Sequence, residues 1–307
     1  MEAIIHMFGG IMKRFAAAAV LAILPFSFLA AQFPVISQIS AIETLKASVL
    51  PEALEFSISE PAAAKVLAAV IPENLAGEQL FQYLHNLPDP SMSSNNQYKT
   101  AKAYMYSKAD NVICNGQPGI ITFYSEVCVN GTSANGNDYP EQGDMNDDGV
   151  VDKFINAEHI WPQGYFKSAY PMVADLHQLA ATFVTPNSRR GNLPFAMVSD
   201  ASYSTSCGSK LGQEGFEPCD SVKGNVARAM LYFIVRYYDH NIRIGMGYDN
   251  FWVKRVPMFL EWNHADPPDA NERRRNDLVE AFQGNRNPFI DDSSLADRVG
   301  AAVFSSH

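Results

Sequence analysis

The spacing of apolar residues along the chain predicts three helices. In residues 76–87 the apolar side chains recur at helical intervals, and the segment Pro88-Asp89-Pro90 ends the pattern. A final helix is predicted to begin in the segment 271–285 and to end at Gly284. The longest of the three helices covers residues 222–240, and one stripe of it is apolar: Val226, Ala229, Met230, Phe233, Ile234 and Tyr237.

Other apolar runs have the composition of strands. Residues 112–128 are rich in β-branched and aromatic side chains, which indicates a strand region. The aliphatic run 154–157 predicts a strand that ends in an adjacent acid and histidine. Residues 175–195 have an extended, β-branched middle, after which a short helix is expected to begin at Asn187. The predicted fold class is therefore α+β, a mostly helical single domain around a strand, strand, helix unit.

Composition and charge limit the classes of function. The chain has 307 residues, 47% of them hydrophobic, which is enough for one large core or two modest ones. Its formal net charge is −10, of which residues 1–150 carry −8 (7 basic and 15 acidic side chains). An acidic chain does not coat nucleic acid by charge alone, but a local basic cleft is compatible with this balance.

The beginning of the sequence has the pattern of an export signal. Met12-Lys13-Arg14 forms a basic start, and the apolar run 15–31 ends in small residues. We interpret residues 1–31 as a secretory signal peptide, followed by an Ala-rich extension over residues 32–75. The alternative is a membrane anchor, because this run is near the lower length limit for a span. The signal predicts a secreted or periplasmic protein with no stable membrane insertion after cleavage.

Four cysteines fit an exported chain. None belongs to a Cys-x-x-Cys pair, which argues against a zinc knuckle or a redox motif. Four cysteines allow three connectivities, and the simplest one links Cys114 to Cys128 and Cys207 to Cys219. Free buried thiols are the alternative.

A polar loop over residues 130–149 continues into a pattern that is similar to a calcium-binding loop. Oxygen-bearing side chains stand at alternate positions, a glycine follows for the turn, and the seventh position offers a backbone carbonyl. The twelfth position, where a bidentate Glu belongs, is Ile155. A truncated loop that holds a structural Ca²⁺ is therefore one interpretation, and an acidic turn is the other. The five ligand positions of the first interpretation are Asp144, Asn146, Asp148, Val150 and Asp152.

The end of the strand over residues 154–157 offers the chemistry of a metal-dependent hydrolase. Mg²⁺, or Mn²⁺ in its place, binds oxygen ligands and keeps several waters. Glu158 on the strand and Asn187 on the following helix supply two such oxygens. His159 then remains free to act as a general base.

Several motifs around these residues resemble the endonuclease I family of exported, non-specific nucleases. The family pattern is Asn-x-Glu-His-x-x-Pro, then Asp-Leu-His-x-Leu, then Asn-x-x-Arg-x-Asn-x-Pro-Phe. The segments 216–237 and 283–292 also look like family segments, and the resemblance covers residues 75–292. The matching residues are Asn156, Glu158, His159 and Pro162; Asp175, Leu176, His177 and Leu179; and Asn187, Arg190, Asn192, Pro194 and Phe195.

The resemblance implies a ββα-metal nuclease core within a domain over residues 76–292, followed by a C-terminal tail over residues 293–307. It implies that His159 is the general base and that Glu158 and Asn187 bind the metal. Two positions depart from the pattern. Gln178 stands where many relatives have a second His, and Ala181 stands where Pro is common.

The roles of the other motif residues are less specific. Asp175 and His177 are expected to orient the site without touching the metal. Asn156 and Asn192 are expected to satisfy loop backbone groups. No Arg lies between His159 and Arg189 to bind the phosphate, which leaves three cations for that contact. They are Lys167, Arg189 and Arg190, and for Arg190 a pair with a carboxylate is the alternative.

The resulting hypothesis is a monomeric endonuclease that uses one Mg²⁺ to hydrolyse DNA, with RNA as a further substrate. The resemblance implies 5′-phosphate ends and little sequence preference, since contacts to phosphates carry no sequence information. The alternative is an inactive secreted protein that binds calcium or a partner on a nuclease scaffold. A zinc hydrolase is excluded because the chain has no His-Glu-x-x-His motif or cysteine cluster.

Overall fold

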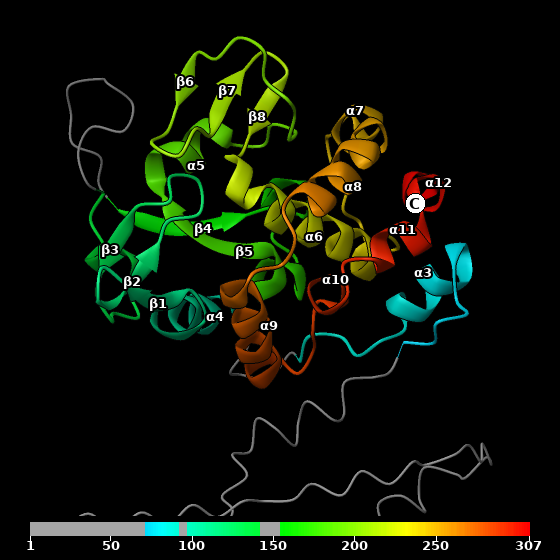
Figure 1. Ribbon diagram of the computed structural model, residues 1–307, viewed down its shortest axis with the longest axis horizontal. Coiled ribbons are helices and arrows are strands. Elements are labelled where there is room, and N and C mark those ends of the chain that lie inside the picture. The colour runs from blue at the N-terminus through cyan, green and yellow to red at the C-terminus, as the bar shows by residue number, and fades with distance from the viewer. Residues whose placement is uncertain (1–70, 92–96, 142–153) are drawn as a thin grey trace, which may run out of the picture. The chain divides into compact units, whose positions relative to one another are not determined.

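The computed structural model describes residues 71–91, 97–141 and 154–307 (Figure 1). The predicted signal peptide, nearly all of the Ala-rich extension and the calcium-like loop over residues 144–152 lie outside these ranges. Within them the protein is of mixed α+β class, with helices and small antiparallel sheets. No helix in the described part of the chain has the length and apolar character needed to cross a membrane.

Eight short strands form three separate sheets, and each pair of neighbouring strands is antiparallel. The predicted strand region over residues 112–128 is a three-stranded sheet, in which residues 122–127 form the turn between the second and third strands. The strands of the three sheets are β1 Asn111–Cys114, β2 Gln117–Ile121 and β3 Cys128–Asn130; β4 Ile155–His159 and β5 Leu179–Phe183; and β6 Tyr203–Ser204, β7 Lys210–Gly212 and β8 Gly215–Glu217.

The helices surround the central pair β4–β5 (Figure 1). All three predicted helices are present, as α3, α6 and α9. The α-helices in the described part of the chain are α3 Gly77–His85, α4 Tyr98–Tyr104, α5 Val184–Arg190, α6 Asp220–Tyr237, α7 Tyr248–Phe251, α8 Val256–Ala265, α9 Ala270–Gln283, α10 Pro288–Asp291, α11 Leu295–Val299 and α12 Ala301–Ser306.

The helix α6 lies in the middle of the core and packs against α3, α8 and α10. The apolar stripe predicts one buried face, but nearly every side chain of α6 is buried. Its buried cations are paired, as in the Arg228–Glu272 ion pair, which compensates their loss of water.

The helix α9 begins and ends at its sequence signals. The side chain of Asp269 accepts a hydrogen bond from the Glu272 N–H, which caps the first turn. Gly284 follows the last turn with φ of 84°, a left-handed conformation that glycine adopts without steric cost. This helix is not the last one, as the sequence prediction had it. Residues 295–306 form α11 and α12, and they bury Leu295 and Phe304 in the core.

Both predicted disulfides are confirmed, and no cysteine is free. Cys114–Cys128 links β1 to β3 across the first sheet. Cys207–Cys219 ties the loop between β6 and β7 to the residue before α6. Each disulfide closes a short loop and is worth about 3 kcal/mol in the chain-entropy model.

Candidate active site

The strand β4 carries Glu158 and His159 as its last two residues. Its register with β5 is fixed along the whole strand, and Glu158 lies opposite Ala180. Successive side chains of a strand point to opposite faces, so the two residues face different surroundings. Both are buried, with 2% of Glu158 and 5% of His159 exposed.

The helix α5 packs directly on β4, with Asn187 and Arg190 facing the strand. The helix begins at Val184, earlier than predicted, and Pro186 lies within its first turn, where a missing N–H costs little. Asn187 donates through Nδ2 to Oδ1 of Asn156 at 2.7 Å and to the Ala157 carbonyl at 3.3 Å. Its Oδ1 remains as an oxygen that can bind a cation. Asn156 therefore fixes the Asn187 side chain. The expected contact of Asn156 with loop backbone stays a prediction.

Arg190 is completely buried and binds the end of β4. Its Nη1 donates to Oε1 of Glu158 at 2.8 Å and to the His159 carbonyl at 2.9 Å. Its Nη2 donates to the Ile160 carbonyl at 2.7 Å. The guanidinium also lies 4.4 Å from the centre of the Phe195 ring. These contacts place Arg190 as the carboxylate partner of Glu158, away from solvent.

Glu158 is held through one of its two oxygens. The Tyr124 hydroxyl donates to Oε1 at 2.8 Å, and Arg190 donates to the same oxygen. Oε2 accepts no hydrogen bond from the described residues. Burial raises the pKa of Glu158, while Arg190 and the Tyr124 hydrogen bond oppose that rise. A carboxylate held in this way presents one oxygen to a hard cation, as Mg²⁺ or Mn²⁺ requires.

His159 is oriented by a backbone carbonyl. Its Nε2 lies 3.1 Å from the carbonyl oxygen of Val173, and a carbonyl only accepts, so Nε2 carries the proton. In the neutral ring Nδ1 is then unprotonated and can take a proton from water. Burial, together with the nearby charges of Lys102 and Arg190, lowers the pKa of His159 to about 4, although the hydrogen bond to Val173 opposes this fall. The imidazole is therefore neutral at pH 7.

The family model that matches this chain is that of endonuclease I, over residues 76–294. The chain belongs to the endonuclease I family. Two similar proteins are the "Extracellular ribonuclease" of Bacillus amyloliquefaciens and that of Bacillus subtilis (strain 168). Each is 37% identical over 155 residues, which are 47% of this chain and 53% of the relative. The chain thus spans about half the length of the curated relatives it matches.

The two departures from the family pattern both lie beside β4. Gln178 is completely buried; its side chain donates to the Met172 carbonyl and accepts from the Trp161 N–H. The Gln178 side chain therefore satisfies one backbone carbonyl and one backbone N–H next to the site. Ala181 lies on β5 opposite Ala157 and keeps its N–H, which donates to Asp110 at 2.8 Å. A proline at this position would lack that donor.

Asp175 and His177 lie behind the site, in the turn that leads into β5. Oδ2 of Asp175 accepts from the hydroxyls of Tyr232 and Tyr237 at 2.8 and 2.6 Å. Oδ1 accepts from the His177 N–H at 3.0 Å, and His177 Nε2 bonds to the Asn285 carbonyl at 2.9 Å. No bond joins either side chain to Glu158 or His159. Asp175 therefore anchors the start of β5 to α6, and His177 anchors it to the segment after α9. Their predicted role in orienting the site remains a proposal.

Asn192 and the remaining cations are exposed. The backbone carbonyl of Asn192 accepts from the Tyr165 hydroxyl at 2.8 Å. Arg189 extends over the Tyr203 ring at 5.6 Å, and Lys167 lies at the surface after a short helical turn.

Sequence reasoning missed a second group of residues around His159. Tyr98 and Lys102 belong to α4, and the Tyr98 ring lies 5.4 Å from the His159 ring. Lys102 Nζ lies 4.5 Å above the Tyr98 ring. Tyr124, which binds Glu158, follows β2. Tyr124 is 34 positions from Glu158 in the sequence, and Tyr98 and Lys102 are farther away. No motif connects these residues to β4, so no sequence signal could have indicated the contacts.

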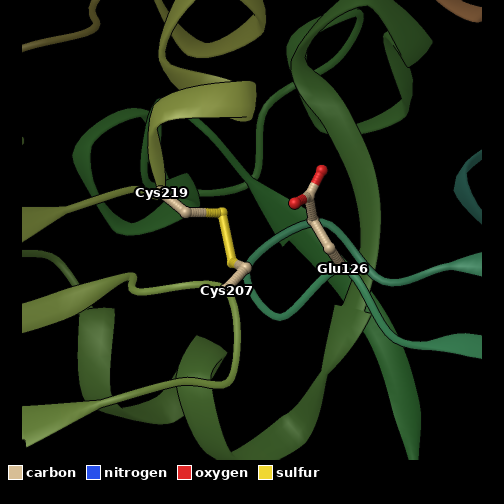
Figure 2. A group of neighbouring side chains, drawn as sticks. All are labelled: Glu126, Cys207 and Cys219. Carbon is tan, nitrogen blue, oxygen red and sulfur yellow. A yellow bond between two sulfur atoms is a disulfide. The ribbon is translucent and has the colours of Figure 1, made fainter.

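A cluster of Glu126, Cys207 and Cys219 has the spacing of a metal site, but its chemistry excludes one (Figure 2). The two sulfurs form a disulfide, and only a thiolate is a good metal ligand.

A cavity of about 200 Å³ lies along β5, and its walls include His177, Leu179 and Arg275. Neither Glu158 nor His159 lines it, so it is separate from the candidate site.

Loss of the Arg190 guanidinium should destabilise the protein strongly. Arg190→Met leaves the Glu158 carboxylate buried without its ion-pair partner, which costs about 3–5 kcal/mol in the free energy of unfolding. The matched control is Arg189→Met, which changes an exposed side chain and should stay within about 0.5 kcal/mol. Urea unfolding monitored by circular dichroism measures both. A stable Arg190→Met variant that is deficient only in DNA binding would instead identify Arg190 as a phosphate contact.

Proposed function

We propose that the protein is a secreted or periplasmic endonuclease that hydrolyses phosphodiester bonds with one divalent cation, Mg²⁺ or Mn²⁺. The observation that carries this proposal is the arrangement at the end of β4. His159 has its Nε2 proton bound to Val173, and Glu158 has one oxygen bound by Arg190 and Tyr124. His159 is thus oriented to act as a base, and Glu158 is oriented to bind a cation. Family membership and the strand, strand, helix order of β4, β5 and α5 support a ββα-metal core.

In the proposed reaction His159 removes a proton from a water aligned with the phosphorus, through Nδ1. The Val173 carbonyl keeps the imidazole ring in the tautomer that allows this transfer. Oε2 of Glu158 and Oδ1 of Asn187 are the oxygens that would hold the cation. When bound there, a divalent cation supplies a positive charge that stabilises the charge developing on phosphate oxygens. The water oxygen bonds to phosphorus, the P–O3′ bond breaks, and the leaving 3′ oxygen takes a proton from water. The products are a 3′-hydroxyl and a 5′-phosphate end, as the family resemblance implies.

DNA and RNA are the proposed substrates, and the protein is proposed to act as a monomer. The Bacillus relatives carry the name extracellular ribonuclease, which favours RNA beside DNA. Contacts mainly to phosphates would give little sequence preference. The predicted Ca²⁺ loop remains a proposal for a structural ion.

The proposal is tested by incubating the purified protein with supercoiled plasmid and with single-stranded RNA in Mg²⁺. Cleavage of either substrate, with nicks that DNA ligase reseals, is expected. Nicks that ligase cannot reseal would contradict 5′-phosphate products. A folded protein that cleaves neither substrate would favour the alternative of an inactive, calcium-binding scaffold.

Lys102 is the proposed contact to the scissile phosphate. It is the cation over Tyr98, whose ring contacts His159, and its charge lowers the pKa of His159. Lys102→Met should lower kcat/KM about tenfold, since it removes one charge near the developing negative charge. Lys99→Met removes the same charge from an exposed position of the same helix and is the control. Equal effects of the two variants on plasmid cleavage would refute a specific role of Lys102.

A further inference from the structure

Tyr170 presents an aromatic ring to solvent close to the candidate active site. Its side chain is 50% exposed, one of six exposed large hydrophobic side chains among the described residues. Aromatic rings are usually kept from water, because each buries a large apolar area on folding. An exposed ring at a fixed place next to a catalytic group therefore suggests that a ligand covers it.

Two separate connections link Tyr170 to His159. The Tyr170 hydroxyl accepts a hydrogen bond from the Tyr98 N–H at 3.2 Å, and the Tyr98 ring lies 5.4 Å from the His159 ring. Three residues after Tyr170, the Val173 carbonyl binds Nε2 of His159 at 3.1 Å. The segment that carries Tyr170 is therefore the one that orients the proposed base.

The loop before Tyr170 has an unusual backbone that local hydrogen bonds support. Lys167 and Ser168 both have φ of 52°, in the left-handed region that L-residues rarely adopt. The Ser168 N–H donates to the Gln163 carbonyl at 3.0 Å, and the Ser168 hydroxyl donates to Oε1 of Gln163 at 3.2 Å. The Val173 N–H donates to the Ala169 carbonyl at 3.1 Å. Backbone strain that the surrounding bonds maintain is typical of ligand-binding segments.

We propose that the Tyr170 ring is a stacking platform for an unpaired nucleobase next to the phosphate at His159, so that the protein prefers single-stranded nucleic acid. This inference rests on the proposed nuclease function of the same site. Aromatic rings beside a positively charged path are the usual means of binding single strands, and Lys102 supplies a cation over the adjacent Tyr98 ring. In a duplex the faces of each base are covered by its neighbours, so stacking on Tyr170 would require a base to leave the helix.

The test measures the binding of short oligonucleotides to His159→Ala protein. If His159 is the base, this variant does not cleave the probes, and Kd can be measured at equilibrium. The probes are a single-stranded octanucleotide, the same strand with abasic residues throughout, and its duplex. Tyr170→Leu keeps an apolar side chain but removes the aromatic plane, and Tyr170→Phe restores the ring without the hydroxyl. Ile113→Ala, at a more exposed apolar position on β1, is the control.

Tyr170→Leu is expected to bind the natural single strand about tenfold more weakly, while the abasic strand and the duplex are unaffected. Tyr170→Phe and Ile113→Ala should bind like the parent. Equal affinity of Tyr170→Leu and the parent for the natural strand would overturn the stacking proposal, and so would an equal loss for the abasic strand. Cleavage by the wild-type protein is measured separately, so an inert wild type would reject the nuclease function without deciding the stacking site.

Discussion

The variant His159→Ala is expected to lose cleavage by a factor of about 10²–10⁴ in kcat, the usual contribution of a general base. Nδ1 of His159 is the atom that would accept the proton, because Nε2 is committed to the Val173 carbonyl. Binding of DNA and of the cation should persist, since a general base acts on the water and is a proposed ligand of neither. The steady-state rate of plasmid cleavage and the Kd for DNA measure the two effects separately.

The control for this prediction is a histidine outside the site. His264 is exposed and bonds to Asp297, so His264→Ala should cleave like the wild type. An equal loss in both variants would point to general damage and not to a missing base. Weaker DNA binding by His159→Ala that accounts for the whole loss of cleavage would show that His159 holds substrate and is not a base.

Replacement of Asn187 or Glu158 should weaken Mg²⁺ binding, so that cleavage requires more Mg²⁺. The loss of activity at low Mg²⁺ should be on the order of 10²-fold, which is typical of changes around metal sites. Asn187→Ala removes one of the two proposed oxygen ligands, and high Mg²⁺ should recover part of the activity. Glu158→Ala removes the other and also leaves Arg190 without its carboxylate, so its loss should be larger and should include stability. The rate of cleavage as a function of Mg²⁺ concentration measures both.

Two further variants make this prediction specific. The double variant should lose little beyond the worse single variant, because both residues serve the same ion and losses within one functional unit are not additive. Asn192→Ala changes an exposed side chain of the same motif and should keep the wild-type Mg²⁺ dependence. Losses that multiply in the double variant would indicate that Glu158 and Asn187 act on different steps.

The parts of the fold that the sequence predicted are those with local signals. The aliphatic run before Glu158 indicated β4, and the long apolar stripe indicated α6. The disulfides followed from short loop lengths, which favour pairing between near neighbours. The start of α5 was predicted too late, because Pro186 was not recognised as a first-turn residue.

What the sequence could not predict depends on contacts between distant segments. The spacing of Asn187 and Arg190 indicates one helix face but not whether Arg190 meets a phosphate or a carboxylate. The structure decides this through burial, since Arg190 is bound to Glu158 and is not exposed. The helices α11 and α12 have five and six residues, too few for a periodic pattern to be recognised.

We propose that His159, beside a cation that Glu158 and Asn187 would hold, promotes hydrolysis of phosphodiester bonds. The most direct test is plasmid cleavage by the wild type and His159→Ala with Mg²⁺, after EDTA, and after Mg²⁺ is added back. The wild type should cleave with Mg²⁺, stop in EDTA and recover on re-addition, while His159→Ala stays inactive throughout. Cleavage by the wild type that persists in EDTA, or wild-type rates from His159→Ala, would contradict the claim.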